Sequence, residues 1–171
     1  PLAGNQITSD IAKIFRTPIS NAEEIKVNYA CALKDMVSME ESIEVPSVGG
    51  RPARVMSRHT LAEVIEPRYQ ELFELIHKEI KNSGFEEQIA AGLVLTGGTA
   101  KMEGAVEIAE EIFQMPVRVG SPLNMVGLSE YTDDASFATA VGLLHYGKMQ
   151  ADNKKTSKQR VADGLFKRVQ S

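Results

Sequence analysis

The sequence has few of the residues that cross-link small proteins or bind metals in them. Cys31 is the only cysteine among 171 residues, so no disulfide can form within the chain and no Cys-X-X-Cys pair exists. The three histidines lie far apart in sequence and match no recognised metal-ligand spacing. Tryptophan is absent and aromatic residues make up only 6%, so aliphatic side chains must fill the core.

Complete enzyme motifs are missing as well. The chain has no GxGxxG, no P-loop lysine motif and no recognisable Ser-His-Asp, Cys-His or paired-carboxylate arrangement. Its apolar runs are far shorter than a membrane span. The sequence therefore gives no independent sign of catalysis, and any nucleotide would be bound by part of a site.

Charge is distributed unevenly along the chain. The net charge is −4, yet residues 148–171 contain seven basic and only two acidic residues. The remaining body is acidic and has no aromatic-basic stripe, which argues against nucleic-acid binding by this body. A basic tail on an acidic body predicts contact between the tail and an anionic surface, either a membrane or a nucleic acid.

What is present is an organising segment, Gly92–Gly104, with the sequence GLVLTGGTAKMEG. An apolar run over Ile89–Leu95 precedes a Gly97-Gly98 turn, and helical spacing follows over residues 102–113. The run does not alternate, so we expect a strand covered on both faces in a parallel or mixed sheet. Adjacent glycines let backbone N–H groups approach a ligand. The pattern fits a nucleotide contact or a tight turn without ligand, and a lone Gly-Gly pair favours the second.

Helical spacing marks four further segments. A capping box from Ser20 to Glu23 is expected to open the second of them. On that helix Glu23 and Lys26 lie three residues apart and share a face. Spacing alone is explained by a solvent-exposed ion pair. Pro67 leaves open whether the third helix begins there or at Thr60. The four helices are expected over residues 7–15, 20–30, 60–81 and 135–147.

Short strands are expected over Leu33–Val37, Ser42–Val48, Ala53–Ser57 and Val117–Val119. The first three are interpreted as a small antiparallel unit inserted into something larger. A polar linker follows the last core helix. An amphipathic pattern then closes the chain, made by Val161, Leu165, Phe166, Lys167, Arg168 and Val169.

Several stretches together resemble the FtsA family of bacterial cell-division proteins, which are actin-like and bind ATP. They include EVPSVGGR at 44–51, LAEVIEPRY at 61–69 and AVGLLHYGK at 140–148, with shorter matches at 4–12, 22–27 and 92–98. The resemblance implies an α/β fold: an actin-like (ribonuclease H-like) second lobe with an incomplete mixed sheet, helices and a small α+β inserted subdomain. The family's first lobe and the phosphate-binding turn that opens the second are not matched, so we expect a fragment truncated at both ends.

The resemblance also implies how the chain is divided. Residues 1–20 and 89–148 would form the core of the lobe on its nucleotide-binding side. Residues 21–88 would be the inserted subdomain, which binds FtsZ and contacts neighbouring molecules in a filament. Residues 149–159 would be a linker, and residues 160–171 the truncated start of an amphipathic membrane-targeting helix.

Residue roles follow from the same resemblance. Glu23 and Lys26 match a pair that holds the ribose hydroxyls in actin-like proteins, which favours a nucleotide site over a plain turn. Thr96, Gly97, Gly98 and Thr99 would lie along the adenosine and phosphates. ATP is the implied cofactor, with Mg²⁺ in a full-length protein but no metal ligand in this segment. The implied FtsZ-tail site consists of Arg51, Arg54, Arg58, Arg68 and Tyr69, and the implied membrane contact is made by the terminal amphipathic residues.

The implied function is that of an adaptor rather than an enzyme, with weak or no ATPase activity. Such a protein polymerises and ties FtsZ filaments to the cytoplasmic membrane at the division septum. Its partners would be the FtsZ C-terminal tail, further copies of itself, other divisome proteins and the anionic inner face of the membrane. The alternatives are a type IV pilus assembly ATP-binding protein of the same fold and an ATP-dependent kinase or chaperone.

Overall fold

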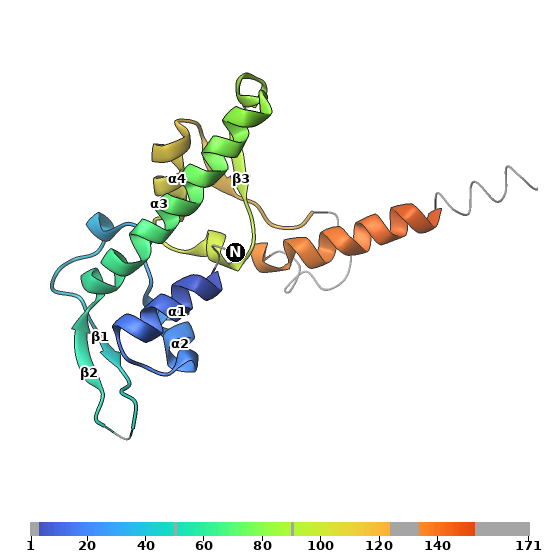
Figure 1. Cartoon of the computed structure of the whole chain (residues 1–171). Helices are drawn as coiled ribbons and strands as arrows, with labels where there is room; N and C mark the ends of the chain where they lie inside the picture. The colour runs from blue at the N-terminus through green and yellow to red at the C-terminus, as the bar shows by residue number, and fades with distance from the viewer. Residues whose placement is uncertain (1–3, 50, 90, 124–133, 153–171) are drawn as a thin grey trace, which may run out of the picture. The chain divides into compact units, whose positions relative to one another are not determined.

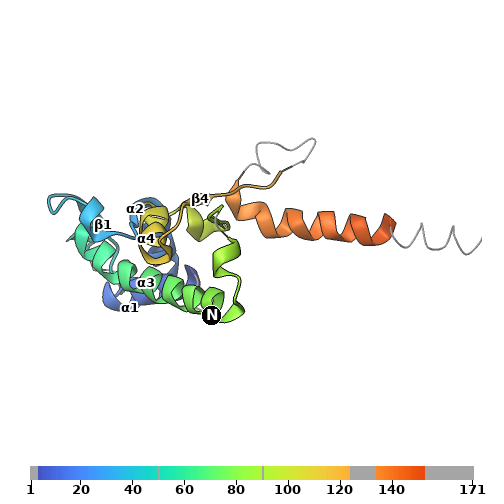
Figure 2. The same ribbon diagram turned by 90° about the horizontal axis from the view of Figure 1, so that it is seen from above.

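The computed structural model describes residues 4–49, 51–89, 91–123 and 134–152. The chain forms two compact units, residues 1–120 and 121–171. In the first unit the long helix α3 (Arg58–Ser83) is the central element, and shorter helices pack along it (Figures 1 and 2). The first unit contains every candidate ligand residue that the structure describes.

Two helices open the first unit and pack against each other (Figure 1). They are α1 (Gly4–Ile14) and α2 (Ile19–Tyr29), which confirms both expected helices. The expected capping box is wrong: the residue before α2 is Pro18, and no side chain caps the helix. Glu23 does not reach back to the helix start because its carboxylate accepts hydrogen bonds from Lys26 and Thr8 instead.

A hairpin follows, formed by β1 (Ser42–Val45) and β2 (Arg54–Ser57), which pair antiparallel as expected. The strand expected over Leu33–Val37 is wrong, since Lys34–Met36 form a 3-10 turn, η1. The Glu66 carboxylate on α3 accepts from the Lys34 backbone N–H at 2.8 Å. This tertiary bond fixes the turn, and residue patterns alone do not reveal it.

The helix α3 is continuous through Pro67, so the alternative start at that proline is wrong. An interior proline costs a helix about 3 kcal/mol. Two residues before it, Leu61 and Ile65, and two after it, Tyr69 and Phe73, are all buried. Burying both halves of the helix against one core offsets the cost. Gly84 ends the helix in the left-handed region, with φ of 73°, as expected for a glycine cap.

The organising segment contains a shorter strand than the apolar run Ile89–Leu95 suggested, β3 (Leu93–Leu95), which follows a 3-10 turn, η2 (Glu86–Gln88). The Gly92 N–H donates to the Ile89 carbonyl oxygen at 2.9 Å, so the chain turns before the strand begins. β3 pairs in parallel with β4 (Val117–Val119), which confirms the strand expected over those residues. The expectation that both faces of β3 are covered is wrong within the described residues, because Val94 is 52% exposed.

After β3, a 3-10 turn η3 (Gly98–Lys101) leads to helix α4 (Ala105–Phe113), which packs on α3. The helix thus begins three residues later than the apolar spacing from Met102 suggested. One hydrophobic cluster contains residues from α1, α2, β1, α3, α4 and β4. The part assigned to an inserted subdomain therefore shares its core with the rest of the first unit, and the proposed internal boundaries stay a prediction.

The second unit contains η4 (Ala135–Phe137) and a helix over residues 138–152. The expected end at Gly147 is wrong: the helix continues through that glycine and through residues 149–152 of the expected linker. A glycine costs a helix only about 1 kcal/mol relative to alanine, so it need not stop one. The terminal amphipathic residues lie outside the described part. In the part described, no helix is both long and apolar enough to cross a membrane.

Candidate functional site

Lys26 lies where α1 meets α2 and makes three hydrogen bonds there. Its ammonium group donates to Glu23 Oε2 at 2.7 Å, to Thr8 Oγ1 at 2.9 Å and to the Gly4 carbonyl oxygen at 3.3 Å. The residue is 9% exposed. An ammonium group has three protons, and these acceptors engage all of them. The buried charge is therefore fully compensated, and it joins the two helices.

Glu23 carries the opposite charge and faces solvent. Partial burial raises the pKa of its carboxyl group, but hydrogen bonds from Lys26 and Thr8 and the charge of Lys26 outweigh burial. The pKa of Glu23 consequently lies below the ordinary value of 4.5, and the group is ionised at neutral pH. Its side chain is 49% exposed, at the rim of a shallow hollow that Asn5, Ile19 and Ser20 also line. An exposed carboxylate at such a rim can accept hydrogen bonds from ligand hydroxyls.

The Gly-Gly turn lies close to the Glu23–Lys26 pair, and Gly4 at the start of α1 lies between them. A Cβ atom added to Gly4 would lie 2.7 Å from Thr99 Cγ2 and 3.3 Å from Lys26 Nζ. Gly4 therefore separates the turn from the Glu23–Lys26 pair by a single backbone segment. Although the two signals lie far apart in sequence, the fold brings them to one location, as a shared ligand would require.

The turn itself borders open space at Gly97. Gly97 has φ of 96°, a conformation that side-chain-bearing residues rarely adopt, and a Cβ atom there would meet nothing within 4 Å. Thr96 and Gly98 are exposed, while the next alanine, Ala100, is buried. The glycines thus expose backbone at the end of a parallel strand, where open α/β sheets bind ligands.

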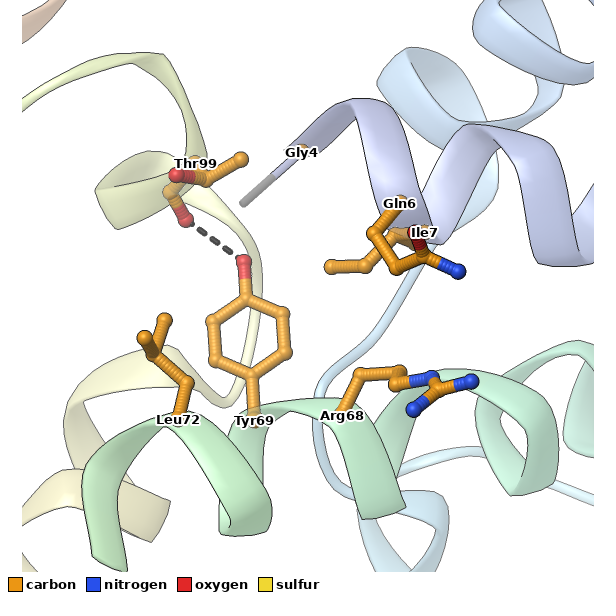
Figure 3. A pocket seen from close by; sticks show the side chains of 7 residues that line it. All are labelled: Gly4, Gln6, Ile7, Arg68, Tyr69, Leu72 and Thr99. Carbon is orange, nitrogen blue, oxygen red and sulfur yellow. Dashed lines mark hydrogen bonds between the residues drawn. The ribbon is translucent and has the colours of Figure 1, made fainter. Parts of the chain in front are cut away.

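Tyr69 is not where the resemblance places it. It was expected on a partner-binding surface, but it is 3% exposed and its hydroxyl donates to the Thr99 carbonyl oxygen at 2.7 Å (Figure 3). Burial raises the pKa of the Tyr69 phenol well above its ordinary value, so the hydroxyl keeps its proton and stays a donor. Tyr69 is thus a buried residue that supports the Gly-Gly turn from the protein interior.

The four arginines of the expected FtsZ site do not form one cluster of free cations. Arg51 is exposed next to the β1–β2 hairpin, whereas the Arg54 guanidinium donates to the Phe15 carbonyl oxygen. Arg68 pairs with Asp10 on α1 at 2.7 Å and with Glu71 at 2.9 Å. Internal partners therefore hold Arg54 and Arg68, and a third arginine, Arg58, is held in the same way.

Arg58 is the most heavily bonded of the four. Its guanidinium donates to the Tyr29 carbonyl oxygen at 2.8 Å, to Glu41 at 2.7 Å and to Glu103. These partners come from three separate segments, and the arginine side chain is only 17% exposed. Whether this set binds a partner stays a prediction, but at Arg58 the structure shows an internal link between segments.

Sequence patterns did not reveal two members of the Lys26 network. In the sequence, Thr8 lies within the expected helix over residues 7–15 and Gly4 lies before it, and neither residue was assigned a role of its own. In the structure Thr8 is buried, with its hydroxyl 2.9 Å from the Gly4 carbonyl oxygen. Lys26 lies 18 residues further along the chain, and no local spacing rule connects positions that far apart.

Comparison with solved structures assigns the fold. The chain resembles MreB5 of Spiroplasma citri bound to AMPPNP, with a TM-score of 0.69 and 19% sequence identity over 91% of this chain and 46% of that one. MreB5 bound to ADP gives a TM-score of 0.68 at 18% identity, over 90% and 46% of the two chains. The chain therefore has an actin-like fold, which confirms the expected fold class.

Sequence comparison then gives the family. The family model described as "Cell division protein FtsA" matches residues 1–142. The cell division protein FtsA of Pseudomonas aeruginosa is 58% identical over 147 residues, and that of Escherichia coli K12 is 54% identical over 155 residues. The chain belongs to the FtsA family of cell division proteins, as its sequence motifs suggested. These matches cover 86% of this chain but only 35% and 37% of the two relatives.

Proposed function

We propose that the chain supplies one side of an ATP site in an actin-like cell-division adaptor. The adaptor polymerises and ties FtsZ filaments to the cytoplasmic face of the membrane at the septum, and turns over ATP slowly or not at all. The observation that carries the nucleotide assignment is the meeting of the Glu23–Lys26 pair and the Gly97–Thr99 turn around Gly4. The similar MreB5 structures hold AMPPNP and ADP, which supports the same ligand class here.

The proposed division of labour follows from charge. The ionised Glu23 carboxylate accepts hydrogen bonds from the ribose hydroxyls. The three ammonium protons of Lys26 are donated to Glu23, Thr8 and Gly4. Lys26 therefore orients the Glu23 carboxylate and adds positive electrostatic potential, and it does not bind phosphate directly. The exposed backbone at Gly98 and the open space beside the half-buried Gly97 let the nucleotide pack closely against the turn. Mg²⁺ would arrive with the ATP and be bound by its phosphates in a full-length protein.

The test compares two adjacent glutamates on α2. Glu23→Gln removes the ribose-binding charge, whereas Glu24→Gln makes the same change at an exposed neighbour that lines a different hollow. In a full-length protein that carries this segment, we expect Glu23→Gln to raise the ATP dissociation constant about tenfold. Equal affinity of the two variants in ATP titrations would overturn the assignment.

The proposed contact with FtsZ is confined to the cations that remain accessible. Arg51 is exposed by the hairpin, and Arg54 is exposed apart from its bond to Phe15. Charge reversal at Arg51 should weaken binding of an acidic FtsZ tail peptide, most strongly at low salt. Peptide affinity that is the same for Arg51→Glu and wild type at low salt would place the site elsewhere.

The proposed membrane contact rests on the sequence alone. In the sequence, Val161, Leu165, Phe166 and Val169 recur at helical spacing, and Lys167 and Arg168 accompany them. Such a basic amphipathic helix lies in the plane of the interface, and each basic residue near an anionic surface contributes about 1 kcal/mol. We expect weak, salt-sensitive recovery of this chain with anionic vesicles in flotation, lost on deletion of residues 163–171. Equal recovery on neutral vesicles would contradict the anchor.

A further inference from the structure

Tyr69 is held rigidly by aromatic neighbours. Its ring meets Phe73 edge-on, with centroids 5.7 Å apart, and Phe73 in turn meets Phe113 on α4 at 5.6 Å. Both phenylalanines are buried. Edge-to-face pairs of this kind favour one ring orientation. The direction of the Tyr69 hydroxyl is therefore set by the packing of α3 on α4, before any ligand binds.

The target of that hydroxyl is the main chain of the turn. It donates to the Thr99 carbonyl oxygen at 2.7 Å (Figure 3). Two backbone hydrogen bonds at the ends of the turn are longer: Ala100 N to Gly97 O is 3.2 Å, and Met102 N to Thr99 O is 3.3 Å. The phenol thus makes the shortest of these bonds, and it comes from a different element. A turn of two glycines with long internal bonds needs such an external contact to stay in one conformation.

The same turn of α3 also holds α1. Arg68 donates to Asp10 at 2.7 Å, and the residue after it, Tyr69, donates to Thr99. Both residues line a pocket with Gly4, Ile7 and Leu72 (Figure 3). Consecutive residues of α3 therefore bond the two elements that meet at Gly4, which are α1 and the Gly-Gly turn.

We propose that Tyr69 is a positioning residue: its hydroxyl holds the Gly97–Thr99 turn against the start of α1, so that nucleotide affinity depends on an α3 side chain that touches no nucleotide. This inference rests on the proposed nucleotide site and adds one residue to it. Without the hydroxyl, the turn samples other conformations, and part of the binding energy is spent on ordering it.

Tyr69→Phe is a selective test because the apolar ring stays in place. The Thr99 carbonyl keeps its bond from Met102 N, so no acceptor is left without a partner. Tyr29→Phe is the matched control, since it removes a hydroxyl from a tyrosine that is 44% exposed. The variants are made in a full-length protein that carries this segment. Each is measured by backbone hydrogen exchange over residues 96–102, by ATP titration and by urea unfolding.

For Tyr69→Phe we expect faster exchange over residues 96–102 and an ATP dissociation constant raised about 3- to 10-fold, with the unfolding midpoint close to wild type. Tyr29→Phe should change neither exchange nor affinity. Unchanged exchange and affinity in Tyr69→Phe would overturn the inference. So would faster exchange with unchanged affinity, if Glu23→Gln weakens ATP binding in the same assay. If wild type itself binds no ATP, the proposed function fails, and exchange alone decides whether Tyr69 holds the turn.

Discussion

Two cations in the first unit, Lys26 and Arg58, each bind three oxygen acceptors, yet they do different work. Lys26 is 9% exposed, and its acceptors lie on α1 and α2. The Arg58 side chain is 17% exposed, and its acceptors are Tyr29, Glu41 and Glu103. The carboxylate beside Lys26 lies at a solvent-facing hollow next to the Gly-Gly turn, whereas Arg58 joins three segments with no candidate ligand residue among them.

The difference shows that residue type and charge do not separate a binding cation from a structural one. The family resemblance assigned both positions to sites, Lys26 to the ligand site and Arg58 to the partner site. What distinguishes them is the destination of their hydrogen bonds. A cation whose donors end on three distant segments is expected to matter most for stability, and one beside an exposed carboxylate for ligand binding.

The largest effect should come from reversing the structural cation. Arg58→Glu removes three hydrogen bonds and places a third carboxylate between Glu41 and Glu103. We expect a loss of about 3 kcal/mol in the free energy of unfolding, measured by urea denaturation of this chain. Arg51→Glu makes the same change at an exposed site and should lie within about 0.5 kcal/mol of wild type. Similar stabilities of the two variants would mean that Arg58 is free to serve a partner.

A smaller loss of stability is expected at Lys26, because fewer segments depend on it. Lys26→Met keeps the aliphatic volume but removes the charge, leaving Glu23 with Thr8 as its remaining donor. We expect a loss of about 2 kcal/mol in unfolding free energy, and a larger fractional loss of ATP affinity than in Arg58→Ala. If Arg58→Ala weakens ATP binding as much as Lys26→Met at equal stability, the contrast between the two cations fails.

The Gly-Gly turn allows a test that leaves both cations intact. Gly98→Val puts a branched side chain at an exposed position where the backbone must approach the ligand. We expect the ATP dissociation constant to rise about tenfold, with a change in unfolding free energy below about 1 kcal/mol. A variant that binds ATP like wild type would remove the turn from the site.

The sequence predicted elements where local patterns decide, and failed where tertiary contacts decide. The helix expected over residues 60–81 follows from apolar residues at helical spacing, and α3 (Arg58–Ser83) includes that whole range. The continuity of α3 through Pro67 and the turn at Lys34 depend on burial and on the Glu66 carboxylate, which no local pattern shows. For the site, the sequence showed the Glu23–Lys26 pair and the Gly-Gly turn as two separate patterns. Their meeting at Gly4 and the inward role of Tyr69 depend on how α1 and α3 pack.

The smallest expected effect is in the pH dependence of stability. It involves Glu23 beside Lys26 and Glu41 beside Arg58. The pKa of Glu23 is lowered as described above, and hydrogen bonds from Arg58 and the Ser38 backbone lower the pKa of Glu41 from its ordinary 4.5. A lowered folded-state pKa adds stability above the unfolded value, and this stability is lost as pH falls through the folded value.

Both carboxylates should therefore make the chain less stable as the pH falls below about 4.5. Urea unfolding between about pH 6 and pH 3 should show a shallower decline in Glu23→Gln and in Glu41→Gln than in wild type. Glu24→Gln should decline as wild type does, because it removes a carboxylate that neither cation holds. The same decline in wild type and in both test variants would show that neither carboxylate draws stability from its cation. A shallower decline in Glu41→Gln alone would mean that the Lys26 network is already loosened in solution, leaving Glu23 free for a ligand.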